Sequence, residues 1–294
     1  MKTLPRLLLS ISLLLPLAVH AGGSQDLQRT HKGHLVTQVR IAGHGEQLFV
    51  VDTGASESAV YAHARTRMKL AAEPGSEIEM HGAGGSQTVQ RYRLPRLSVA
   101  GVDADRLLVS GLPRGIQHGE DVMGVLGRDV FGGYLVEFDL ASDRLGLHRP
   151  GEMPRSARGW NEVPIHLMPQ VGLVMVDVML GGAKVTAVLD TGARQTFMNW
   201  RAARAAGVSK GEGSDKAKTA GGATGHAVRY SLRTFDAIAI GATRFRPSAL
   251  AISDLPVFVP IGMDQAPAMI VGLDLMGDRR FVIDYPGRRL LIER

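Results

Sequence analysis

VVDTGASES, residues 50–58, ends a short apolar run with an aspartate and a turn, and VLDTGARQT, residues 188–196, repeats it. The two aspartates, Asp52 and Asp190, are 138 residues apart. A carboxylate at the end of an apolar strand loses its hydration when it is buried, so a fold that keeps one needs a compensating reason. Two such turns in one chain predict that the two aspartates meet.

The two turns belong to a longer internal repeat. Each follows a strand-like alternation, and each precedes a glycine-rich turn, HGAGGS (81–86) or AGGATG (220–225). Near the end of each half, VLGRDVFGG (125–133) matches IVGLDLMGD (270–278), 145 residues later. A tandem duplication explains these features in the same order better than chance.

Short runs of Val, Ile and Leu, separated by Gly, Pro and Asp, dominate both halves and predict an all-β fold. We expect two β-barrel lobes related by a pseudo-two-fold axis, residues 30–149 and 161–294, joined by a linker rich in Pro, Gly and Arg at 150–160. Few short helices are expected. The longer ones are predicted at 58–70 and 196–206, and short turns are predicted near Asp129 and Asp274.

The N-terminus is typical of a secretory signal peptide. Lys2 and Arg6 precede the apolar run 7–19, and Val19-His20-Ala21 places small residues where a signal peptidase cuts. This run is shorter than the ~20 apolar residues that span a bilayer, and no later stretch is long and apolar enough to hold the chain in a membrane. We therefore predict that residues 1–21 are cleaved and that the mature protein is periplasmic or secreted, with no stable membrane insertion.

The composition excludes several classes of function. The chain of 294 residues has no cysteine, which removes disulfides, thiolate metal sites and a cysteine nucleophile. Its formal net charge of +6 is spread over single arginines, and this pattern does not favour nucleic acid as a partner. Because both halves of the repeat are present in one chain, we expect a monomer.

Packing of the two lobes about their axis would bring Asp52 and Asp190 together. Two carboxylates a few ångströms apart cannot both ionise easily, so they share one proton and titrate as a coupled pair. One carboxylate then serves as a base that activates water, and the other donates a proton to a carbonyl oxygen. The pattern therefore predicts hydrolysis without a metal, a cofactor or a nucleophilic side chain.

The neighbours of the aspartates suit this chemistry. Gly54 and Gly192 let the backbone turn tightly and approach the carboxylates with N–H donors. Thr53 and Thr191 are placed to hydrogen-bond across the lobe interface and fix both aspartates.

Ser58 and Thr196 stand six residues beyond the two aspartates. A hydroxyl side chain at this place caps a following helix or bonds back to the preceding turn. We expect one of these two roles for both residues.

These motifs resemble the aspartic proteases, and more closely the retropepsin-like branch than pepsin. The shared features are Asp-Thr-Gly-Ala twice, a glycine-rich turn after each, and an apolar-apolar-Gly element before the closing strands (125–127 and 270–272). Gly127-Arg128-Asp129 is similar to the retroviral protease helix signature. The resemblance covers nearly all of the mature chain, as a single-chain counterpart of the retroviral homodimer of the kind found among exported bacterial proteases.

The resemblance implies an aspartic endopeptidase that cleaves extended protein or peptide segments, with Asp52 and Asp190 as the catalytic pair. It also implies two flaps that close over the substrate. The flap residues expected to bind substrate are Gly82, Ala83, Gly84, Gly85, Gly221 and Gly222.

The chain departs from the family pattern after each Asp-Thr-Gly-Ala. Retroviral enzymes carry an aspartate there that pairs with the arginine of Gly-Arg-Asp, whereas this chain has Ser56 and Arg194. Arg128 is therefore expected to lack its usual partner, and Arg194 is expected to pair with Asp274 or Asp129.

Ala55 and Ala193 replace the Ser or Thr of pepsin-like enzymes. A hydroxyl bonded to the carboxylate favours its charged form, and alanine removes that donor. We therefore predict activity at mildly acidic to near-neutral pH.

Two other functions fit parts of the pattern. Similar Asp-containing turns cradle phosphate in actin-like ATPases and sugar kinases, but those folds interleave helices with strands, and an exported protein has no supply of ATP. A catalytically inactive peptide-binding protein with the aspartic-protease fold is the alternative that stays open, although both aspartates and both glycines are intact.

The histidines near the N-terminus are candidate metal ligands by residue type. His31, His34 and His44 lie close in sequence, but no acidic residue has suitable spacing, so we predict no metal site. His81, beside the first flap, and the apolar stretch 255–263 are candidates for substrate contact. The competing interpretations are a solvated loop histidine and an ordinary core or lobe–lobe contact.

Overall fold

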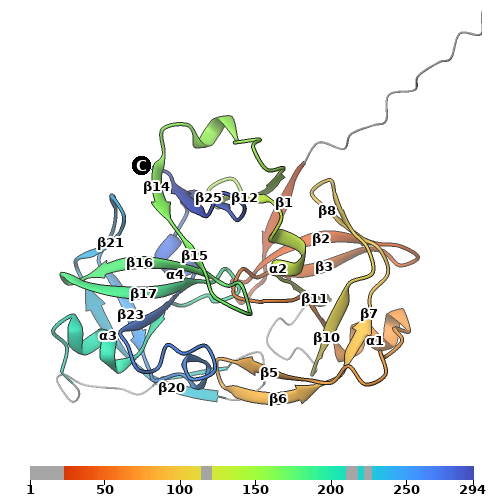
Figure 1. Cartoon of the computed structure of the whole chain (residues 1–294), viewed down its shortest axis with the longest axis horizontal. Coiled ribbons are helices and arrows are strands. Elements are labelled where there is room, and N and C mark those ends of the chain that lie inside the picture. Colours follow the sequence, from red (N-terminus) through yellow and green to blue (C-terminus); the bar gives the residue numbers. More distant parts are fainter. Residues whose placement is uncertain (1–22, 114–120, 210–217, 222–226) are drawn as a thin grey trace, which may run out of the picture.

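The computed structural model describes residues 23–113, 121–209, 218–221 and 227–294. Its described residues form an all-β, two-lobed structure with few short helices, as the sequence predicts. Figure 1 shows the first lobe on the right and the second on the left. The helices are α1 (Ala62–Met68), α2 (Arg128–Phe131), α3 (Trp200–Ala205) and α4 (Leu273–Met276), with 3-10 turns η1 (Arg155–Ala157) and η2 (Pro256–Phe258).

The largest sheet contains the first lobe and the strands that join the lobes. Its strand order is β14 (Asn161–Pro164), β26 (Arg289–Ile292), β25 (Arg280–Asp284), β12 (Leu135–Asp139), β13 (Arg144–His148), β1 (Ser24–Arg29), β2 (Leu35–Ile41), β3 (Gly45–Val51), β11 (Val122–Leu126), β4 (Ala59–Tyr61), β10 (Leu108–Leu112) and β7 (Arg91–Arg93). Strand β8 (Leu97–Val99) pairs with β2 and with β9 (Val102–Ala104).

The second lobe has its own sheet, and the first lobe adds a separate hairpin. The sheet runs β19 (Lys218–Gly221), β20 (Ala227–Phe235), β23 (Ser248–Ile252), β18 (Phe197–Met198), β24 (Ala268–Val271), β17 (Ala183–Leu189), β16 (Val174–Leu180), β21 (Ile238–Ile240) and β22 (Thr243–Phe245), with β15 (His166–Leu167) paired to β16. The hairpin consists of β5 (Ile78–Gly82) and β6 (Gly85–Val89).

The duplication is visible in the strand pairing around each aspartate. In the first lobe β3 lies parallel to β11, which is antiparallel to β4. In the second lobe β17 lies parallel to β24, which is antiparallel to β18. The strands that lead into Asp52 and Asp190 end in buried Val51 and Leu189, so each aspartate leaves the sheet at the same point of its lobe.

A shared antiparallel pairing joins the lobes, between β12 and β25 (Figure 1). Its register places Glu137 opposite Val282, and these residues differ by the 145-residue offset of the repeat, so the pseudo-two-fold axis passes between them. Phe138 stacks on its partner Phe281 with ring centroids 4.7 Å apart, and both rings are fully buried. Burial of each such side chain contributes about 1.5–3 kcal/mol, which fixes the lobes to each other.

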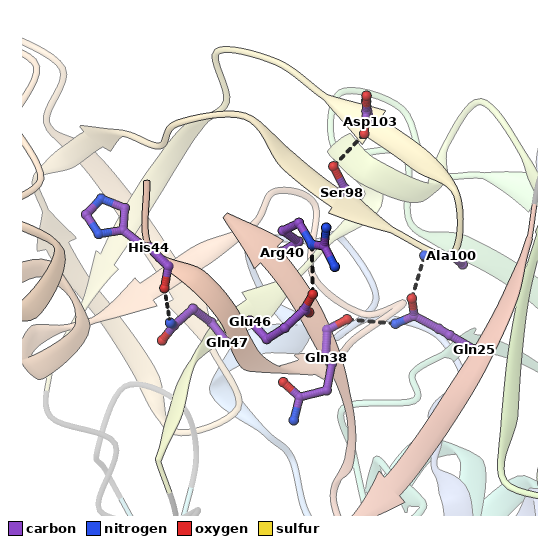
Figure 2. Close-up of polar contacts among 9 residues, drawn as sticks. All are labelled: Gln25, Gln38, Arg40, His44, Glu46, Gln47, Ser98, Ala100 and Asp103. Carbon is purple, nitrogen blue, oxygen red and sulfur yellow. Dashed lines mark hydrogen bonds and ion pairs between the residues drawn. The ribbon is translucent and has the colours of Figure 1, made fainter. Parts of the chain in front are cut away.

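Strand β1 ties the first lobe to this joining sheet. Its first half pairs with β13 and its second half with β2. The amide of Gln25 fills the gap that opens: its Nε2 donates to Gln38 O at 2.8 Å, and its Oε1 accepts from Ala100 N at 2.6 Å (Figure 2). A surface hollow lies beside these bonds and is lined in part by Gln25, Gln38, Arg40 and Glu46. Its polar side chains are bonded to one another, as Arg40 is to Glu46, so we assign this hollow no binding role.

The two longer helices begin later than the sequence predicts. The first few residues of each predicted segment form strands, Ala59–Tyr61 in β4 and Phe197–Met198 in β18. Each short strand pairs on both sides with neighbours in its sheet, and tertiary pairing overrides local helical preference. The short helical turns predicted near Asp129 and Asp274 are present as α2 and α4.

Two predictions fall on residues that the structure does not describe. The signal peptide at 1–21 and the flap residue Gly222 lie outside the described ranges. Among the helices of the described residues, none is long and apolar enough to cross a membrane.

Candidate active site

The structure brings Asp52 and Asp190 together at the interface of the lobes. Each aspartate is held to the neighbouring parallel strand by its backbone: Asp52 N donates to Leu126 O at 3.1 Å, and Asp190 N donates to Val271 O at 2.9 Å. Both side chains are partly buried. The two sheets therefore fix the backbone positions of both aspartates through main-chain hydrogen bonds alone.

The threonines of the two turns form a symmetric set of hydrogen bonds across the interface. Thr53 N donates to Thr191 Oγ1, and Thr191 N donates to Thr53 Oγ1, each at 3.1 Å. Each hydroxyl then donates to a carbonyl of the other lobe at 2.8 Å, Thr53 to Leu189 and Thr191 to Val51. Both threonines are buried. Every donor here is satisfied by the opposite lobe, which holds the two turns in one relative orientation.

The glycines of the turns permit the close approach of the carboxylates. A Cβ placed on Gly54 would lie 2.4 Å from Cγ of Asp190, and one placed on Gly192 would lie 2.3 Å from Cγ of Asp52. Any side chain there would displace the opposite carboxylate. Gly54 N and Gly192 N also donate to Oδ1 of their own aspartate at 2.8 and 2.9 Å. The six residues predicted for this site are thus assembled as one unit.

The electrostatics are those of a coupled carboxylate pair. Burial raises the pKa of Asp52 well above its ordinary value, and the charge of Asp190 and a hydrogen bond between the two carboxyls raise it further. Burial also raises the pKa of Asp190, while the hydrogen bond with Asp52 and the N–H groups of Ala193 and Gly192 act in the opposite direction. Because burial raises both pKa values and the two carboxyls lie side by side, the pair favours one shared proton.

A comparison with protein families identifies this arrangement. A family described as aspartyl protease matches residues 37–130 and residues 176–275, which together make up more than half of the chain. The chain belongs to the aspartyl protease family. The match occurs once in each half, around Asp52 and around Asp190. A comparison with curated protein sequences gave no significant match.

In this aspartyl protease, each turn is anchored to a short helix by a hydroxyl and a carboxylate. Ser58 donates through N and Oγ to Asp129 Oδ1 at 2.9 and 2.7 Å, and its Oγ accepts from Gly127 N at 3.0 Å. Thr196 repeats this with Asp274 and Gly272. Neither predicted role is the observed one: the hydroxyls of Ser58 and Thr196 bond to the closing elements at Gly127–Asp129 and Gly272–Asp274, because these elements, far away in sequence, pack against the turns.

Sequence reasoning missed the partners in these anchors. The repeated Gly-x-Asp of the two closing elements was the available signal, because an aspartate that recurs in phase with the turns is a candidate partner for them. The predicted ion pair of Arg194 with Asp274 or Asp129 is wrong. Those carboxylates accept from Thr196 and Ser58, and Arg194 Nη1 donates instead to Lys32 O at 2.8 Å.

Arg128 of the Gly-Arg-Asp motif packs rather than pairs. Its Nε is buried and forms no hydrogen bond in the described part of the chain. The guanidinium lies against Gly172, where an added Cβ would come within 2.3 Å of Nε. Arg128 therefore contacts a loop of the second lobe through its guanidinium.

Tyr61 is a second residue near the pair that sequence reasoning did not select. It ends β4, is buried, and its pKa is raised by burial and then by the nearby charge of Asp52. The phenol therefore stays neutral throughout the pH range in which the aspartates titrate.

The first predicted flap is the turn of the β5–β6 hairpin. Gly82 pairs with Gly85 across its end, and Ala83 packs against an apolar cluster of the second lobe that includes Phe258. A hollow lies where the two lobes meet here. It is lined by His81, Gly82, Gly85, Ser86, Pro256, Val257, Val259 and Pro260. The stretch 255–263 thus forms a lobe–lobe contact with the flap.

The second predicted flap is described only in part. Gly221 ends β19 and pairs with Ala227 of β20. The structure brings the first flap, but not Gly221, into a described contact with the opposite lobe.

The histidines of the N-terminal segment are not gathered around a metal position. Within the described ranges, no group of three or more His, Asp or Glu side chains is placed to hold a metal ion. His34 is instead buried against the second lobe, with Nδ1 3.2 Å from Gly192 O. The structure thus joins the HKGH segment to the turn of Asp190.

Proposed function

We propose that this aspartyl protease is an active endopeptidase in which water held between Asp52 and Asp190 attacks the scissile peptide carbonyl. The observation that carries the proposal is the reciprocal approach of each glycine to the opposite carboxylate. A fold kept only for binding does not need two backbones pressed against two carboxylates at van der Waals limits. This approach supports an acid and a base that exchange a proton directly.

The chemistry follows from one shared proton. The ionised Asp190 removes a proton from the water, and the protonated Asp52 donates to the carbonyl oxygen as the water adds to the carbonyl carbon. The product is a tetrahedral diol, and both aspartates have exchanged roles. Asp190 then gives its proton to the amine nitrogen, while Asp52 takes a proton from a diol hydroxyl, so that the C–N bond breaks, the two product chains leave and the pair returns to its starting protonation.

Substrates are expected to be extended segments of protein or peptide. A hairpin flap presents backbone N–H and C=O groups that pair with a strand-like ligand. Gly84 and its neighbours at the hairpin turn give the flap the freedom to open and close over such a segment. The proposed flap contacts are those of Gly82, Ala83, Gly84 and Gly85, with Gly221 and Gly222 in the second lobe.

The raised pKa values of both aspartates set the working pH. Because burial raises both values, the singly protonated pair persists to higher pH than it would in solvent-exposed carboxylates. We propose activity at mildly acidic to near-neutral pH, by a monomer acting after export and removal of residues 1–21.

The test is cleavage of a denatured protein and of a peptide library by the mature chain between pH 3 and pH 8. Wild type is expected to cut, and the Asp52→Asn and Asp190→Asn variants are expected to be folded and inactive. A wild type that binds peptides as the variants do, and cuts none at any pH, would identify a peptide-binding protein instead. A pH optimum below about 3 would contradict the electrostatic account.

A further inference from the structure

The segments that precede β2 and β16 carry different residues at corresponding positions. Thr30–His34 in the first lobe forms a closed turn that precedes β2, and Met168–Leu173 in the second lobe forms the corresponding turn before β16. Strand register aligns Leu35 with Val174, so His34 corresponds to Leu173. An imidazole in one lobe therefore replaces an isobutyl group in the other.

The turn that carries His34 is rigid. Thr30 N donates to His34 O at 3.0 Å, His34 N donates to Thr30 Oγ1 at 3.1 Å, and Gly33 N donates to Thr30 O at 2.7 Å. Gly33 has φ +83°, a conformation that favours glycine. Thr30 and His34 are both buried. The imidazole is thus held in place from its own backbone.

The imidazole reaches the turn of Asp190 through one peptide group. His34 Nδ1 lies 3.2 Å from Gly192 O, and because a carbonyl oxygen can only accept, Nδ1 carries the proton. The N–H of the same peptide unit belongs to Ala193 and donates to Asp190 Oδ1 at 3.0 Å. The side chain, the peptide and the carboxylate therefore form a continuous chain of hydrogen bonds.

The two turns share most of these bonds, because Ala55 N and Ala193 N lie 3.4 and 3.3 Å from the backbone oxygens of Asp52 and Asp190, and the Ala55 N–H also acts against the burial that raises the pKa of Asp52. The difference lies behind the peptide: Gly192 O accepts from His34, whereas Leu173, which corresponds to His34, has no hydrogen-bond donor in its side chain. Hydrogen bonds in a chain polarise and strengthen one another. Donation to Gly192 O therefore strengthens the Ala193 N–H as a donor, which favours negative charge on Asp190 over Asp52.

We propose that His34 is a positioning residue that makes Asp190 the ionised, water-activating member of the pair, by donating through the Gly192–Ala193 peptide. This inference rests on the proposed function, since it assigns the base within that site. Burial raises the pKa of Asp52, and the negative charge of Asp190 raises it further. This direction agrees with the assignment. The other charged side chains of the two segments in contact are those of His31, Lys32 and Arg194.

The experiment combines two variants with two measurements. His34→Leu reproduces the residue of the other lobe and removes the donor, and His34→Asn keeps an N–H near the position of Nδ1. The carboxyl titrations of the pair are followed by ¹³C NMR of Asp-labelled protein, assigned with the Asp→Asn variants. The pH dependence of kcat/KM is measured for the same proteins, with His44→Ala, a histidine on a distant hairpin turn, as the control.

Loss of the donor is expected to move the Asp190 titration and the acidic limb of kcat/KM to higher pH by about half a unit. The His34→Leu variant then loses about threefold in kcat/KM on the acidic side and little on the alkaline side. His34→Asn and His44→Ala keep the wild-type profile. A loss in His34→Leu that is equal at every pH, with a lowered Tm and no change in the carboxyl titration, would show that His34 only packs.

A measurement on wild type covers the case in which His34→Leu does not fold. Long-range ¹H–¹⁵N NMR of the imidazole should show a proton on Nδ1, and an unprotonated Nδ1 would overturn the proposal. The NMR results are independent of turnover. An inactive wild type with the expected titrations would therefore refute the proposed function alone, whereas an active wild type with unchanged titrations in His34→Leu would refute the role of His34 alone.

Discussion

The turns of Asp52 and Asp190 are nearly identical within themselves and differ in what supports them from outside. Both exchange the same threonine bonds and both place a glycine against the opposite carboxylate. His34 hydrogen-bonds to the turn of Asp190. The corresponding residue of the other lobe is Leu173, whose side chain cannot form such a bond with the turn of Asp52. Duplication thus conserves the parts that assemble the pair, and divergence outside the turns makes its two members unequal.

The largest effect is expected when a methyl group is added to either glycine that faces a carboxylate. Gly54→Ala and Gly192→Ala are each expected to reduce kcat by about 100-fold or more, because displacement of a carboxylate by about 1 Å is enough for such a loss. Steady-state cleavage of one peptide gives both values. Gly133→Ala is the control, since an added Cβ there meets nothing within 4 Å. Full activity in either turn variant would mean that the carboxylates need not approach so closely.

The hydrogen bonds of Thr53 and those of Thr191 should contribute equally to the free energy of unfolding. Thr53→Val and Thr191→Val keep the shape but leave a buried N–H of the other turn without an acceptor, so each is expected to cost about 1–3 kcal/mol. Denaturant unfolding measures this cost. Thr53→Ser and Thr191→Ser retain the hydroxyl and should recover most of it. A large difference between the two Val variants would show that the interface is not symmetric.

The aspartate pair should lower stability as pH rises. Since burial and the charge of Asp190 raise the folded-state pKa of Asp52 above an unfolded value near 4, the folded protein loses stability between that value and neutral pH. Asp52→Asn cannot ionise, so its Tm should exceed that of wild type at pH 7 and equal it at about pH 3. The exposed Asp278→Asn serves as the control. A variant with a lower Tm at pH 7 would contradict the sign of this shift.

The smallest expected effect concerns the flap, where the lobes also differ. Val257 lines the hollow against the first flap, so Val257→Ser should weaken closure and raise KM about threefold with kcat unchanged. Met179→Ser, another partly exposed apolar position outside that hollow, is the matched control. An unchanged KM would mean that this contact does not close over substrate.

The sequence was sufficient for the parts of the molecule that repeat. The all-β class, the duplication and the assembly of Asp52 and Asp190 followed from motifs in phase, because a repeated local pattern folds the same way twice. The predicted starts of the two longer helices were wrong, because Ala59–Tyr61 and Phe197–Met198 pair with strands that are far away in sequence. His34 was out of reach for the same reason, because its partner Gly192 is 158 residues away.

The central claim is that the two aspartates act as one unit, and the rates of four proteins test it most directly. These are wild type, Asp52→Asn, Asp190→Asn and the double variant, compared by kcat/KM for one peptide at the wild-type optimum. We expect each single variant to lose about as much as the double variant, by a factor of about 10³ or more, because a shared proton needs both carboxyls. Substantial activity in either single variant, or losses that add up in the double variant, would contradict the account.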